Sequence, residues 1–195
     1  MRIIGGRLSG RRFGAPGGRG TRPTSDRVRE AVGSALEARG AFDGAHVLDL
    51  FAGTGALGFE AMSRGASDAV LVDSDPGAVR QIKQSSEELG LSGEVLAVRL
   101  NLLGDPLSVV RKLPPMKTAF SLVFADAPYS EVAAIPGILS ALAAAERLAP
   151  GAWLAIEHPA SQQWRWPKGL ASDADYRYGR TGISLGVFAA EKGRQ

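Results

Sequence analysis

Four consecutive residues carry the clearest chemical signal: Asp126-Ala127-Pro128-Tyr129 follow an apolar run at 121–125. An exocyclic amine on guanine or adenine is a poor nucleophile because its lone pair is delocalised into the ring. Two acceptors directed at its N–H bonds favour a pyramidal nitrogen, and the Asp126 carboxylate and the Ala127 carbonyl can supply them. Pro128 fixes the backbone that aims this carbonyl, and Tyr129 offers a face on which a base can stack. These four residues are the predicted catalytic residues of an amino-methyltransferase; a strand-ending turn with a buried tyrosine is the alternative.

A glycine-rich loop at residues 51–58 follows an earlier apolar run. Gly53 and Gly55 let the backbone turn sharply and approach a ligand, and Gly58 allows a helix to pack closely on a strand. Asp73 ends the next apolar run, 20 residues after Gly53. At that spacing a carboxylate can accept hydrogen bonds from both hydroxyls of a ribose. The loop therefore predicts a cofactor that contains a nucleoside.

An acidic residue two positions before this loop distinguishes between two classes of cofactor. The G-x-G-x-x-G pattern with its later acid also suits a nicotinamide dinucleotide. Asp49, however, lies four residues before Gly53, where its carboxylate would repel a pyrophosphate but would suit the ammonium group of an amino-acid tail. S-adenosylmethionine carries that group, so it is the predicted cofactor, with an NAD(P)-dependent oxidoreductase and a purely structural glycine turn as alternatives. The predicted cofactor-binding residues are Asp49, Phe51, Gly53, Thr54, Gly55, Asp73, Ser74 and Asn101, the last beside the adenine.

The elements that position these residues alternate along the chain. Apolar runs predict strands at 46–50, 69–73, 95–98, 121–125 and 152–157, and the segments between them predict helices at 56–64, 76–89, 105–113 and 131–148. Continuously apolar strands separated by helices indicate an α/β fold with a buried parallel sheet and helices on both faces. Stretches 170–178 and 182–189, joined by residues 179–182, predict an antiparallel hairpin. A further helix is expected after Thr24 or Ser25, either of which can cap it.

Composition excludes several kinds of chemistry. The 195 residues include no cysteine and two histidines, which argues against disulfides, thiolate nucleophiles and a metal centre. Methylation of a base carbon is disfavoured too, since it normally needs a thiolate. Neither a secretory signal nor an uncharged apolar stretch of about 20 residues is visible. We therefore expect a cytoplasmic monomer that binds neither a membrane nor a metal.

Positive charge is concentrated at the start of the chain. Residues 1–25 contain six arginines and no acid, whereas the whole chain has a net charge of +3. A basic end on a nearly balanced body suggests a polyanionic partner, with a solubilising tail as the alternative. We expect an extended basic arm over residues 1–23 and a methyltransferase domain over 24–195. Within the arm, Arg7, Arg11 and Arg12 are predicted to contact nucleic acid.

Four segments resemble the bacterial guanine-N2 methyltransferases of small-subunit ribosomal RNA, the methyltransferase D family. They are RPTSDRVRE (22–30), VLDLFAGTGALGFEAMSRGA (47–66), DAPY (126–129) and LAPGAWLAIEHP (148–159). The resemblance implies a Rossmann-like class I methyltransferase with a mostly parallel seven-stranded sheet in the order 3-2-1-4-5-7-6. It implies S-adenosylmethionine as the donor and a guanine of 16S RNA, in the small (30S) subunit or its assembly precursor, as the target. Other nucleic-acid bases and protein amides remain alternative targets.

The resemblance also implies roles for particular residues. Arg22, Thr24 and Arg27 would border the catalytic pocket and the RNA. Two positions depart from the family pattern: Ala127 stands where a second proline is usual, and Asn101 stands where an acid is frequent. Alanine keeps the main-chain carbonyl, so we expect activity to survive.

Overall fold

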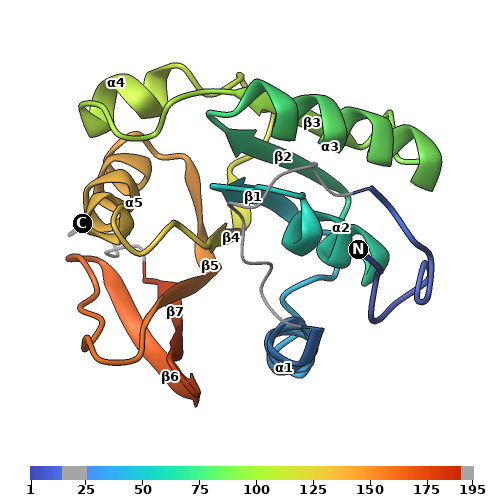
Figure 1. Cartoon of the computed structure of the whole chain (residues 1–195). Helices are drawn as coiled ribbons and strands as arrows, with labels where there is room; N and C mark the ends of the chain where they lie inside the picture. The colour runs from blue at the N-terminus through green and yellow to red at the C-terminus, as the bar shows by residue number, and fades with distance from the viewer. Residues whose placement is uncertain (15–25, 190–195) are drawn as a thin grey trace.

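A seven-stranded sheet forms the centre of the protein (Figure 1). The computed structural model describes residues 1–14 and 26–189. The strands lie in the order β3-β2-β1-β4-β5-β7-β6. Neighbouring strands are parallel from β3 to β5, and β7 is antiparallel to both β5 and β6. The predicted mostly parallel α/β sheet and its strand order are confirmed. The strands are β1 (His46–Leu50), β2 (Asp68–Asp73), β3 (Val95–Arg99), β4 (Phe120–Ala125), β5 (Leu148–Pro159), β6 (Leu170–Tyr178) and β7 (Thr181–Phe188).

Helices cover both faces of this sheet. One apolar cluster joins α1, α2 and α3 to alternate strand residues such as Val47 and Leu71. The other cluster joins α4 and α5 to the strand residues that point to the opposite face of the sheet, such as Leu48 and Val70. Because successive strand residues point to opposite faces, a strand covered on both sides must be apolar throughout. The helical elements are α1 (Asp26–Glu37), α2 (Ala56–Ser63), α3 (Pro76–Leu89), α4 (Pro106–Arg111), the 3-10 turn η1 (Val132–Ala134) and α5 (Ile135–Ala144).

Local signals explain where several elements begin and end. Asp75 caps α3 by accepting a hydrogen bond from the Gly77 N–H, and Gly90 closes the helix in the left-handed conformation. The predicted helix at 131–148 is too long, because α5 ends at Ala144 and Glu146 adopts φ +54° before β5 begins. The predicted connection at 179–182 is also too long, since β7 begins at Thr181.

The first fourteen residues are folded onto the body of the protein rather than extended. Ile3, Leu8 and Phe13 are buried, and the Phe13 ring packs edge-on against Phe59 of α2 at 5.2 Å. The N–H groups of residues 4 and 5 donate to the buried carboxylate of Glu60 at 2.9 and 2.7 Å. The segment is therefore held by apolar burial and by a carboxylate that needs donors. The rest of the predicted arm, including Arg22 and Thr24, lies outside the described residues.

Candidate active site

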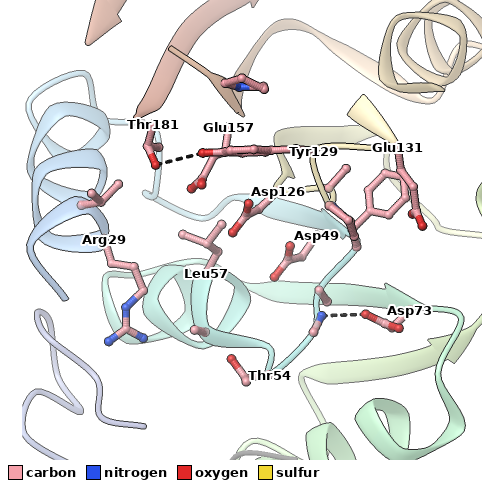
Figure 2. Close-up of a pocket in the computed structure, with 18 of the residues that line it drawn as sticks. Arg29, Asp49, Thr54, Leu57, Asp73, Asp126, Tyr129, Glu131, Glu157 and Thr181 are labelled. Carbon is pink, nitrogen blue, oxygen red and sulfur yellow. Dashed lines mark hydrogen bonds between the residues drawn. The ribbon is translucent and has the colours of Figure 1, made fainter. Parts of the chain in front are cut away.

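A cavity of about 1200 Å³ opens at the edge of the sheet where the parallel strands end (Figure 2). Doubly wound sheets bind their ligands at this edge. All four predicted catalytic residues line the cavity, together with seven of the eight predicted cofactor residues: Asp49, Phe51, Gly53, Thr54, Asp73, Ser74 and Asn101. Gly55, the eighth, is buried behind them. The structure thus brings two motifs that are far apart in the sequence into one site.

The glycine loop needs its glycines for two different reasons. Gly53 and Gly55 adopt φ +54° and +76°, a left-handed conformation that favours glycine. A Cβ atom on Gly53 would meet nothing closer than 4.0 Å, so this residue leaves space for a ligand. A Cβ atom on Gly55 or Gly58 would lie 2.9 or 2.8 Å from the Leu71 side chain. These two glycines let α2 pack closely against β2 and hold the loop in place.

The Asp73 carboxylate is positioned by two backbone N–H groups. Its Oδ2 accepts a hydrogen bond from Gly53 at 2.8 Å, and its Oδ1 accepts one from Asp75 at 2.8 Å. A carboxylate offers about four acceptor positions, so two remain for the hydroxyls of a ribose. The geometry therefore fits the role predicted for this residue.

Asp49 is an almost fully buried carboxylate on the floor of the cavity. It is 1% exposed, and its Oδ2 accepts a hydrogen bond from the Gly58 N–H at 2.9 Å. Burial is the largest of the effects that raise the pKa of Asp49, to about 8; the hydrogen bond from Gly58 opposes it, and the nearby Asp126 and Asp73 also contribute to the increase. A cationic group in the cavity would lower the free energy needed to ionise this buried carboxylate. The ammonium and sulfonium groups of S-adenosylmethionine are such cations, whereas a pyrophosphate would make ionisation of Asp49 less favourable.

Asn101 lies in the cavity wall just after β3. Its Oδ1 accepts a hydrogen bond from the Leu103 N–H at 3.0 Å, which fixes the turn. The same oxygen keeps a second lone pair, and the amide nitrogen can still donate. The adenine contact of Asn101 stays a prediction.

All four residues of the turn that follows β4 line the cavity. Asp126 is half-buried and Ala127 is buried, while the Pro128 carbonyl closes the turn by accepting a bond from the Glu131 N–H at 2.7 Å. Tyr129 is 47% exposed, unlike the buried tyrosine of a purely structural turn. Its hydroxyl donates to the Arg180 carbonyl at 3.4 Å and hydrogen-bonds the Thr181 hydroxyl at 3.2 Å. These bonds tie the ring to the β6–β7 turn.

Several cavity residues were not predicted from the sequence. Glu157 lies in β5 one residue past the last one that pairs with β4, and its place at the end of the predicted strand 152–157 was the signal that could have revealed it. Arg177, Arg180 and Thr181 reach the cavity because β7 runs antiparallel to β5, which returns the hairpin turn to the strand ends. No local sequence signal places that turn beside the catalytic residues.

The predicted nucleic-acid residues separate into two groups. Arg27 is exposed and lines the cavity. Arg7 forms an ion pair with Glu94 at 3.1 Å, and Arg11 donates to the carbonyl oxygens of residues 88 and 89. These partners lie in the last turn of α3 and directly before β3, at the end of the sheet opposite the cavity. Arg12 is exposed, and none of these three arginines lines the cavity.

Within residues 1–14 and 26–189, no group of three or more His, Asp or Glu side chains could hold a metal ion. In the same ranges, no helix is long and apolar enough to span a membrane.

Comparison with known proteins decides the family. The family model described as "Conserved hypothetical protein 95" matches residues 1–187. The chain belongs to this family. YlbH of Bacillus subtilis is 31% identical over 95% of this chain and 97% of its own length. Ribosomal RNA small subunit methyltransferase D of Escherichia coli K12 is 36% identical over 66% of this chain, and the match spans 60% of that protein. The predicted methyltransferase D family is therefore confirmed.

Solved structures agree with the family. The yhhF structure from Escherichia coli has a TM-score of 0.80 and 29% identity, and the match covers 98% of this chain and 99% of that one. An RNA methyltransferase from Salinibacter ruber, solved with S-adenosyl-L-homocysteine, shares the fold with a TM-score of 0.62 and 19% identity over 89% of this chain and 98% of its own. The expectation of an S-adenosylmethionine-dependent family is confirmed, which favours this donor over a nicotinamide dinucleotide.

Proposed function

We propose that this member of the methyltransferase D family transfers a methyl group to the exocyclic N2 of a guanine in 16S RNA of the small ribosomal subunit or its assembly precursor. One observation carries the proposal: the Asp126–Tyr129 turn and the Asp49–Asp73 donor residues share one cavity. The relative from Escherichia coli is named for small-subunit ribosomal RNA, which supports the class of substrate.

The residues of the chain would divide the work as follows. S-adenosylmethionine supplies an electrophilic methyl group on a sulfonium. Asp49 would hold the ammonium end of the donor, and Asp73 would hold the ribose. Asp126 and the Ala127 carbonyl would each accept one N–H of the target amine, which directs the nitrogen lone pair toward the methyl group. As the nitrogen formed its new C–N bond and the S–C bond of the donor broke, the Asp126 carboxylate would take the proton that the nitrogen releases. Such catalysis is positioning and electrostatics, with no covalent enzyme intermediate.

The wall of the cavity offers the RNA both stacking and charge. Tyr129 would stack on the extruded guanine, and extrusion costs less for a loop nucleotide than for a paired one. Arg27, Arg177 and Arg180 line the same cavity and would bind phosphates near the target. Arg7, Arg11, Arg12, Arg22 and Thr24 remain predicted RNA contacts; those described lie away from the cavity and would meet a more distant part of the RNA.

The test combines cofactor binding with product analysis. We expect S-adenosylmethionine, but neither NAD nor NADP, to raise the melting temperature. Asp126→Ala should keep donor affinity within about threefold and lose at least about 100-fold in turnover, since proton acceptance by a positioned side chain is worth that much. Mass spectrometry of ribosomal RNA nucleosides from a deletion strain should show the loss of N2-methylguanosine at one position. Loss of a different methylated nucleoside would refute guanine N2 as the target.

A further inference from the structure

Glu157 is the second carboxylate beside the catalytic turn. Ala125 of β4 pairs with Ile156 of β5 in the parallel ladder, so Asp126 and Glu157 are the next residues on neighbouring strands. Side chains at matched positions of adjacent parallel strands lie on the same face, with the strands about 4.8 Å apart. Both residues line the cavity, and Figure 2 shows their carboxylates side by side near the Tyr129 ring. Glu157 is therefore within reach of a ligand that contacts Asp126.

On one side, these two carboxylates border a small apolar space. A small secondary cavity touches both of them, and its remaining wall consists of Val32, Leu57, Phe124, Ala125, Ala155 and Ile183. Glu157 itself is half-buried. In an apolar setting, a hydrogen bond from a base N–H to a carboxylate is stronger than in water. A base nitrogen that places its lone pair against the carboxylate is correspondingly unfavourable. Glu157 can therefore discriminate strongly between a donor and an acceptor on a bound base.

Guanine and adenine differ at the atom next to the reacting edge. Guanine presents an N1–H beside its N2 amine, whereas adenine and 2-aminopurine present a lone pair at N1. If Asp126 and the Ala127 carbonyl hold the two N–H bonds of N2, the N1–H needs a third acceptor on the same side. We propose that the Glu157 carboxylate accepts the N1–H of the target guanine and thereby sets the preference for guanine. This inference rests on the proposed function and adds the residue that selects the base.

The test changes the base atom and the side chain together. The 16S RNA would be ligated from two pieces, with guanine or 2-aminopurine at the position where the deletion strain has lost its methyl group. It would then be reconstituted into subunit particles. Because 2-aminopurine keeps the N2 amine but lacks the N1–H, the wild type should prefer guanine by about 10- to 100-fold in kcat/KM, the range for a hydrogen bond to a charged group. Glu157→Gln, whose amide can donate as well as accept, should narrow this preference to within about threefold.

Glu131→Gln is the matched control, because Glu131 is another acid of the same cavity but follows the catalytic turn rather than β5. It should leave the guanine preference unchanged. Should Glu157→Gln fail to give a native melting curve, Glu157→Asp replaces it, since retracting the carboxylate should narrow the preference as well. An unchanged preference in the folded Glu157 variant, or no preference in the wild type, overturns the inference. Failure of the wild type to methylate guanine-containing particles would instead overturn the proposed function.

Discussion

The buried Asp49 carboxylate should make donor binding depend on pH. With its pKa raised to about 8, this group is mostly protonated in the free protein at pH 6 and must lose its proton to bind an ammonium ion. The donor should then stabilise the ionised form and release a proton on binding. From the ratio of ionised fractions, affinity should rise about 50-fold between pH 6 and pH 8 and level off above that range.

The assay is calorimetric titration with S-adenosyl-L-homocysteine from pH 6 to pH 9, in two buffers of different ionisation enthalpy. Asp49→Asn is the control, because it keeps the size of the side chain and leaves the titration of the ligand's own amine in place. We expect proton release and the steep pH limb in the wild type only. Equal pH profiles for the two proteins would refute the assignment of Asp49 as the ammonium acceptor.

The raised pKa of Asp49 also predicts how the free energy of unfolding changes with pH. The raised pKa means that the folded state binds more protons than the unfolded state between about pH 4 and pH 8. The free energy of unfolding without donor should therefore fall as pH rises through this window, by up to about 1.4 kcal/mol per pH unit from Asp49 alone. Urea unfolding of wild type and Asp49→Asn across the window measures this contribution as the difference in slope.

Three further changes probe other parts of the site and its support. Tyr129→Ala should weaken RNA binding by about 1–3 kcal/mol through lost stacking, whereas Tyr129→Phe should retain most of the affinity; filter binding distinguishes them. Gly58→Ala should lower the free energy of unfolding by about 1–3 kcal/mol, because its Cβ would lie 2.8 Å from Leu71, and a urea melt without that loss contradicts the packing argument. Removing both Arg177 and Arg180 by alanine should reduce the salt slope of RNA affinity by about two, and an unchanged slope would exclude both as phosphate contacts.

The sequence by itself determined the alternation of strands and helices and the chemistry of two motifs. Strands covered on both faces must be apolar along their whole length, and this pattern can be recognised in the sequence of each strand alone. The cap at Asp75 and the left-handed Gly90 are likewise local signals. Because parallel strands end at one edge of a sheet, the glycine loop and the Asp126 turn could be placed together in advance.

Only the tertiary structure decided what surrounds these motifs. The pairing register of β4 with β5 places Glu157 beside Asp126. The antiparallel pairing of β7 with β5 brings Arg180 to the same cavity. The first fourteen residues fold onto α2 because Glu60, far along the chain, accepts the N–H groups of residues 4 and 5 and Phe59 packs against Phe13. Pairing register and buried polar partners depend on residues that are distant in sequence, so no local pattern contains them.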